Sequence, residues 1–386
     1  MRTEFEFYSP VKIVTGVGES LKLEKWVKLF RAEMVLVIVD KAVSATDAFR
    51  NMTDSMKEQN IAFDIFSDTI PEPPMELIDD LAIQVRKKAY DLVIAVGGGS
   101  PMDTAKAVCM LKNNEGRIKE YLFGGTKTPI HPSVPLICIP TTAGSGSEVS
   151  CASVIEDTEL NIKLSCTHPN LYAEIAILDP LMQKGMPPMV TAGTGMDAMT
   201  HAIESYTSKN SCVFTEMYAR KAIELIAKNL PVVMKDPDNM ESRMMMAQAS
   251  TLAAISMANG GLGAVHGISQ SMGGVAHTPH GITNAILLPK VVKYNCKGDP
   301  IKFADIAGLL GADIRGLTVE EAAEAAGVRI AELNRELGIP DNISSLNVTR
   351  DMFPEIVKGT MGYRLLWMNP IEFTEELAYQ ILEESL

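Results

Sequence analysis

The chain has 386 residues, of which 46% are hydrophobic and 22% charged, a composition typical of a globular protein too long for one ordinary core. Its formal net charge of −13 argues against a nucleic acid or an anionic membrane as a partner, and the sequence holds no clean run of 18 apolar residues that would span a bilayer. Acids stand at the N-terminus where a signal peptide needs apolar residues, and the six cysteines form no Cys-x-x-Cys pair, so we expect a cytoplasmic protein with reduced thiols.

The first half of the chain alternates short apolar runs with helical stretches. The expected strands cover residues 34–39, 62–66, 91–96, 134–140 and 175–178. Helices are expected at 46–59, at 75–89 and directly after the glycines at 97–99. Strands and helices in alternation predict a parallel sheet covered by helices on both faces.

The pattern changes after Asp179-Pro180, where strand-like runs disappear and long segments rich in Ala, Met, Glu and Leu begin. The expected helices cover residues 194–207, 213–229, 240–258, 260–273, 318–337, 350–358 and 372–384. This half should be all-helical. We therefore expect an α/β domain at residues 1–183 and an all-α domain at residues 184–386.

A glycine turn follows the strand at 91–96. Gly97, Gly98 and Gly99 precede Ser100, which suits a helix N-cap, and Asp103 stands where a capping box has its acid. Three glycines allow a ligand to approach bare backbone amides at the positive end of a helix. The turn is neither a GxGxxG motif nor a P-loop, and the structural alternative is a tight strand-to-helix turn. We favour a phosphate-binding role.

Polar residues also follow two other strands. Asp40 ends the first strand, and the loop at 141–148 follows the fourth. In an open parallel sheet, ligands bind beyond the carboxyl ends of the strands, and a carboxylate there accepts from ribose hydroxyls and repels a 2′-phosphate. Asp40 thus predicts that the cofactor is NAD rather than NADP. A purely structural role for Asp40, as a turn or cap residue, is an equal alternative.

Asp197 and His201 are four residues apart in an expected helix, so both side chains would leave the same face and could hold one divalent ion. Taken alone, the pair is better explained as an acid near the N-terminus of a helix and a core histidine one turn later. His266 and His280 supply two more imidazoles in a chain that has only six histidines. This concentration favours a metal site.

Together these residues resemble the iron-dependent (group III) alcohol dehydrogenases, the family of lactaldehyde reductase, 1,3-propanediol dehydrogenase and bacterial butanol dehydrogenases. The resemblance covers nearly the whole chain. The matching motifs are Gly-Gly-Gly-Ser-Pro-Met-Asp (97–103), Thr-Thr-Ala-Gly-Ser (141–145), Gly-Met-Asp-Ala-Met-Thr-His-Ala-Ile-Glu (195–204), Val-His-Gly (265–267) and Thr-Pro-His-Gly-Ile-Thr-Asn-Ala-Ile-Leu-Leu-Pro (278–289).

The resemblance implies a Rossmann-like dinucleotide domain, a helical metal domain, and hydride transfer between NAD(H) and a small primary alcohol or aldehyde. It implies one divalent ion on Asp197, His201, His266 and His280, for which we favour Fe(II) and keep Zn(II) as the alternative. The cofactor residues would be Asp40, Gly97, Gly98, Gly99, Ser100, Asp103, Thr141, Thr142, Ser145, Lys163 and Leu178. It also implies a homodimer or larger homo-oligomer.

The sequence departs from the family pattern at two places. Family members usually carry a second histidine four residues after the first imidazole of Val-His-Gly, and here that position is Gln270. His277 is a candidate replacement as the proton carrier; alternatively, the proton leaves through water and the cofactor ribose, and His277 is a surface residue. Glu72 replaces the usual Asn of the proline-rich loop, and an inward-pointing carboxylate there would further disfavour NADP.

Four other functions compete with this interpretation. Two share the expected fold, namely a zinc enzyme similar to glycerol dehydrogenase and a lyase similar to dehydroquinate synthase. A phosphorylated sugar acid needs basic residues near the metal, and residues 190–205 contain no Lys or Arg. A non-haem iron oxygenase would use two histidines and one carboxylate, and would leave the nucleotide half idle. A nucleotide-binding scaffold would have no use for the metal ligands.

Overall fold

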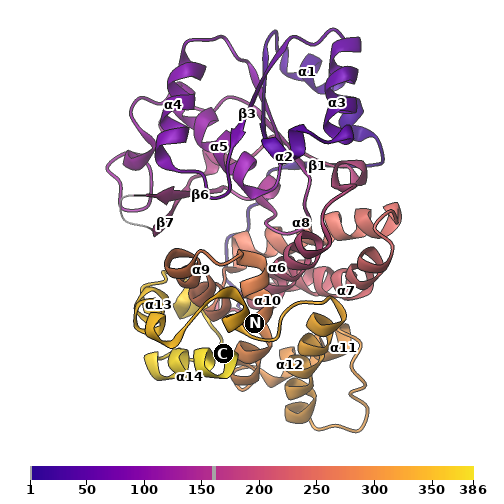
Figure 1. Cartoon of the computed structure of the whole chain (residues 1–386), viewed down its shortest axis with the longest axis vertical. Coiled ribbons are helices and arrows are strands. Elements are labelled where there is room, and N and C mark those ends of the chain that lie inside the picture. Colours follow the sequence, from indigo (N-terminus) through magenta and orange to yellow (C-terminus); the bar gives the residue numbers. More distant parts are fainter. Residues whose placement is uncertain (1, 159–161) are drawn as a thin grey trace. The chain divides into compact units, whose positions relative to one another are not determined.

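The computed structural model describes residues 2–158 and 162–386, which form two compact units (Figure 1). One unit comprises residues 9–142 and 146–186, and the other comprises residues 2–8, 143–145 and 187–386. Among the described residues, no helix has both the length and the apolar character that crossing a bilayer requires. The division at residue 183, expected from the sequence, stays a proposal about domains.

The first unit contains a six-stranded sheet in which every neighbouring pair is parallel. In sheet order, the strands are β1 (Lys12–Thr15), β8 (Ile175–Leu178), β5 (Leu136–Pro140), β4 (Leu92–Gly97), β2 (Val35–Asp40) and β3 (Phe63–Thr69). The four inner strands are runs of almost entirely buried residues, as expected of a sheet covered on both faces. The predicted parallel α/β fold is therefore confirmed.

Five helices accompany the sheet: α1 (Glu24–Phe30), α2 (Lys41–Ser44), α3 (Asp47–Glu58), α4 (Met75–Arg86) and α5 (Gly99–Asn113). Val27 of α1 and Met52 of α3 join the core formed by alternate strand residues such as Val37. Helices α4 and α5 lie on the opposite side in Figure 1, and α5 packs against β2, β4 and β5. An antiparallel hairpin that the sequence pattern did not indicate, β6 (Ala152–Asp157) with β7 (Ile162–Thr167), completes the unit.

The second unit is helical, as predicted. Its helices are α6 (Pro188–Thr207), α7 (Val213–Lys235), α8 (Met240–Gly260), α9 (Ala264–Ala276), α10 (His280–Asn295), α11 (Pro300–Leu309), α12 (Val319–Glu336), α13 (Phe353–Met361) and α14 (Glu375–Ser385). Helix α6 is buried along most of its length and packs against α7, α8 and α10. It is therefore the central element of this unit.

Some helix boundaries differ from the prediction. Helix α7 continues through Pro231 to Lys235, and α10, which contains Pro289, was not predicted at all. Burial of both helices compensates for the hydrogen bond that each internal proline removes. The helix expected at 260–273 begins at Ala264, because Gly261 ends α8 with a φ of 84°. Tertiary packing thus overrides local helix signals in this unit.

Candidate functional site

Three imidazoles converge on one carboxylate oxygen in the helical unit. Helix α6 carries Asp197 and His201 one turn apart, α9 carries His266, and α10 begins at His280. The Nε2 atoms of His201 and His266 each lie 3.7 Å from Asp197 Oδ1, and Nε2 of His280 lies 3.5 Å from it. The structure therefore brings together all four residues that the resemblance implied as metal ligands.

These spacings fit a divalent ion. Ligand atoms placed tetrahedrally at about 2.1 Å from an ion lie roughly 3.4 Å from one another. The observed separations of 3.5–3.7 Å are close to that value and too long for good hydrogen bonds between the ligand atoms. One carboxylate and three imidazoles suit Fe(II) or Zn(II).

The electrostatics of the cluster also suit a cation. Burial acts to raise the pKa of Asp197, but the neighbouring imidazoles outweigh it and hold that pKa below its usual range. Burial lowers the pKa of His201. Burial acts in the same direction on His266, but Glu204 and Asp197 outweigh it and raise the pKa of His266 to about 9. A metal ion would take the place of that proton, because a coordinating imidazole nitrogen must be deprotonated.

Two buried residues beside the cluster were not identified from the sequence. Asn284, one turn after His280 on α10, donates from Nδ2 to Asp197 Oδ1 over 2.8 Å, and its Oδ1 has no hydrogen-bond partner among the described residues. Glu204 accepts from His266 Nδ1. The only available signal was their helical spacing from His280 and His201. That spacing does not reveal which partner helix each residue faces.

The glycine turn lies at the carboxyl end of β4, beside the ends of β2 and β5. A Cβ on Gly97 would lie 2.5 Å from Cγ of Pro101 and 3.3 Å from Oδ2 of Asp40, so only glycine fits there. The predicted capping was wrong. Helix α5 begins at Gly99 with Gly98 as its N-cap, without a side-chain cap. The side chain of Asp103 instead accepts hydrogen bonds from the Ser147 hydroxyl and the Val154 amide.

The other candidate cofactor residues of the α/β unit lie at strand ends or on the hairpin. Thr141 donates its backbone N–H to Gly97 O over 2.9 Å, which joins the two loops, and Thr142 lies against Gly98. Leu178 ends β8 and is buried. Lys163 of β7 forms an ion pair with Glu72, whose backbone N–H donates to Ser100 Oγ over 3.3 Å. The carboxylate of Glu72 is thus engaged by a cation. Ser145 belongs to the helical unit.

Gln270 and His277, the two positions considered for the proton carrier, lie within α9 and directly after its last residue, respectively. Gln270 is half-buried one turn after His266. His277 is exposed and ends the helix in the left-handed conformation, with a φ of 50°. Its backbone N–H donates to Gly273 O.

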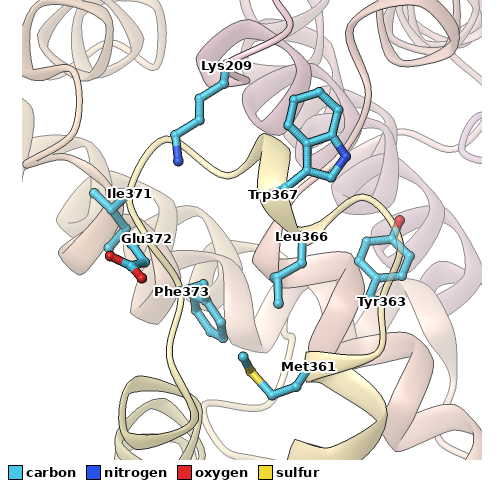
Figure 2. Close-up of a pocket in the computed structure, with 8 residues that line it drawn as sticks. All are labelled: Lys209, Met361, Tyr363, Leu366, Trp367, Ile371, Glu372 and Phe373. Atoms are coloured by element: carbon cyan, nitrogen blue, oxygen red, sulfur yellow. The ribbon is translucent and has the colours of Figure 1, made fainter.

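A separate pocket of about 550 Å³ opens on the helical unit (Figure 2). Its lining is mainly apolar and aromatic and consists of Lys209, Met361, Tyr363, Leu366, Trp367, Ile371, Glu372 and Phe373. Tyr363 and Leu366 pack against Gly267, which follows His266. The pocket therefore adjoins the helix that carries His266, but none of the four candidate ligands lines it.

Comparisons with known proteins match nearly the whole chain. The family model "Iron-containing alcohol dehydrogenase" matches residues 10–180, and "Fe-containing alcohol dehydrogenase family, C-terminal" matches residues 191–386. Lactaldehyde reductase of Escherichia coli (strain K12) is 35% identical over 94% of each chain, and 1,3-propanediol dehydrogenase of Klebsiella pneumoniae is 35% identical over 98% of this chain and 96% of its own.

Solved structures of other proteins also match nearly the whole chain. A crystal structure of 1,3-propanediol oxidoreductase matches 99% of this chain and 100% of its own, with a TM-score of 0.95 and 33% identity. Sulfoacetaldehyde reductase from Bifidobacterium kashiwanohense, solved in complex with NAD+, matches 100% of this chain and 99% of its own, with a TM-score of 0.90 and 26% identity.

Proposed function

The chain belongs to the iron-containing alcohol dehydrogenase family, and from this premise we propose that it transfers a hydride between NAD(H) and a small primary alcohol or aldehyde. The observation that carries the proposal is the convergence of three imidazoles on Asp197. Fe(II) is the proposed ion, with Zn(II) as the alternative that the same donors accept.

The proposed division of labour follows from the residues. When bound, a divalent ion supplies a Lewis acid that lowers the pKa of a hydroxyl group or polarises a carbonyl. Asp197, His201, His266 and His280 would hold that ion. In the α/β unit, the bare amides at Gly97 to Gly99 would receive the pyrophosphate of the dinucleotide, because they stand at the positive end of α5.

An isotope experiment tests the reaction class. NADH carrying one deuterium at the transferable position should pass that label to the product carbon when an aldehyde is reduced, because hydride transfer is direct. Mass spectrometry of the alcohol measures the transfer, and unlabelled NADH in D₂O is the control that should leave the carbon unlabelled. Loss of the label to solvent would contradict the proposal. A lyase on this fold would show no net NADH oxidation with any aldehyde, and an oxygenase would consume O₂.

Preference for NAD over NADP is expected to depend on Asp40. Its Oδ1 caps α2 by accepting from Val43 N over 2.8 Å, and its Oδ2 faces Gly97. Asp40→Gly should lower the ratio of kcat/KM for NADH to kcat/KM for NADPH by at least about tenfold. The substitution removes about 1.4 kcal/mol of repulsion between the carboxylate and the 2′-phosphate of NADPH. The lost cap costs only a few tenths of a kcal/mol with glycine.

The matched control is Asp40→Asn, which keeps a cap acceptor but has no charge. If charge is the determinant, this variant should shift the ratio in the same direction as Asp40→Gly. Wild-type protein with a higher kcat/KM for NADPH than for NADH would refute the NAD assignment.

A further inference from the structure

Both carboxylate oxygens of Glu204 accept hydrogen bonds from the start of helix α9. It lies on α6, three residues after His201, and is 5% exposed. Oε2 accepts from Nδ1 of His266 over 2.6 Å, and Oε1 accepts from the backbone N–H of Val265 over 2.7 Å. One side chain of α6 therefore holds both the imidazole and the backbone at the start of α9.

The contact with the ring decides which nitrogen of His266 carries the proton. A carboxylate can only accept a hydrogen bond, so Nδ1 must be the protonated nitrogen. The neutral ring then has its lone pair on Nε2, the atom that lies 3.7 Å from Asp197 Oδ1. This is the tautomer that a metal ligand needs, and ligating histidines are commonly held in it by a carboxylate.

The contact with the backbone fixes where α9 begins. The first N–H groups of a helix have no partner within the helix, and a negative charge there is favourable. Glu204 accepts from Val265 N, while Asn369 Oδ1 accepts from Ala264 N over 3.2 Å. A Cβ on Gly263 would lie 2.9 Å from Asn369 Oδ1 and 3.2 Å from Glu204 Oε1, so a larger residue there would displace these two side chains from the start of α9.

We propose that Glu204 is a positioning residue of the metal site, which sets metal affinity by fixing the tautomer and the direction of His266. Its charge has a second effect. A buried charge is costly unless it is compensated, and the carboxylates of Asp197 and Glu204 would together balance the two positive charges of a bound divalent ion. The inference rests on the proposed metal site.

Glu204→Gln tests the proposal, because glutamine keeps the shape but has one oxygen instead of two. If that oxygen stays on Val265 N, the amide NH₂ faces Nδ1 and favours the tautomer with the proton on Nε2, which cannot ligate. Zn²⁺ affinity, measured by competition with a chromogenic chelator, should fall 10–100-fold, the effect typical of a lost partner of a ligating histidine. The visible absorption bands of the Co²⁺-loaded protein should also shift.

Asn369→Ala is the matched control. It removes the neighbouring bond to the start of α9, together with the two hydrogen bonds between Asn369 and Asn295, without touching the imidazole. We expect a lower unfolding temperature but a Zn²⁺ affinity close to wild type. If it weakens Zn²⁺ binding as much as Glu204→Gln does, Glu204 acts only by anchoring the helix and the proposal is overturned.

One more variant and two outcomes complete the test. Glu204→Asp keeps the charge on a shorter side chain and should bind Zn²⁺ with intermediate affinity, which provides a second test if the glutamine variant does not fold. Glu204 variants that bind Zn²⁺ like wild type would overturn the positioning role alone. A wild-type protein that binds no Zn²⁺, Co²⁺ or Fe²⁺ would instead refute the metal site of the proposed function.

Discussion

Replacing His280 by alanine is expected to give folded protein that has lost most of its metal and about 10³-fold or more of its kcat. A Lewis acid contributes several kcal/mol of transition-state stabilisation, and each 1.4 kcal/mol is a factor of ten in rate. The fold should survive, because the His280 side chain is 35% exposed, whereas that of His266 is 2% exposed. Truncation at the first residue of α10 therefore leaves little cavity, and alanine is a good helix former.

Metal content of anaerobically purified protein, measured by mass spectrometry beside circular dichroism, checks this expectation. His131→Ala is the control, because His131 is exposed and lies in the α/β unit, and that variant should keep both metal and activity. A His280→Ala protein that still carries close to one ion per chain would show that His280 is not a ligand.

If His277 carries the proton, replacing it by asparagine should lower kcat about 10²-fold and remove a near-neutral inflection from the pH–rate profile, as loss of a general acid–base group does. A proton released from an alcohol must reach solvent, and histidine is the side chain suited to carry it near neutral pH. His277 is exposed at the end of the helix that also carries His266. Asparagine tolerates a φ of 50° at this position, so the substitution should not disturb the backbone.

Gln270→His in the His277→Asn background is the companion experiment. It places an imidazole at the position where the family pattern predicts one, and partial recovery of rate and inflection would show that a titrating group is what the variant lacks. If His277→Asn alone leaves rate and profile unchanged, His277 is a surface residue. The proton would then leave through water and the cofactor ribose.

The sequence by itself determined the parts of this protein that depend on local patterns. Short apolar runs such as 34–39 and 91–96 are typical of inner strands of a parallel sheet, and their alternation with helices predicts the rest of the α/β architecture. Asp197 and His201 share a helix face by spacing alone. The motifs around His266 and His280 then indicated the family and the complete candidate ligand set before any distance was known.

Only the tertiary structure decided how that site is supported. Helix α10 was missed because Pro289 argues locally against a helix, and burial among its neighbours outweighs that signal. Asp103 reads as a capping acid, but packing of α5 against β6 turns it toward Ser147 and Val154. Glu204 meets His266 across 62 positions of sequence, because the folded helical unit brings the start of α9 beside Glu204 of α6. Helical periodicity states which residues share a face, whereas the neighbour of that face depends on the packing of the whole unit.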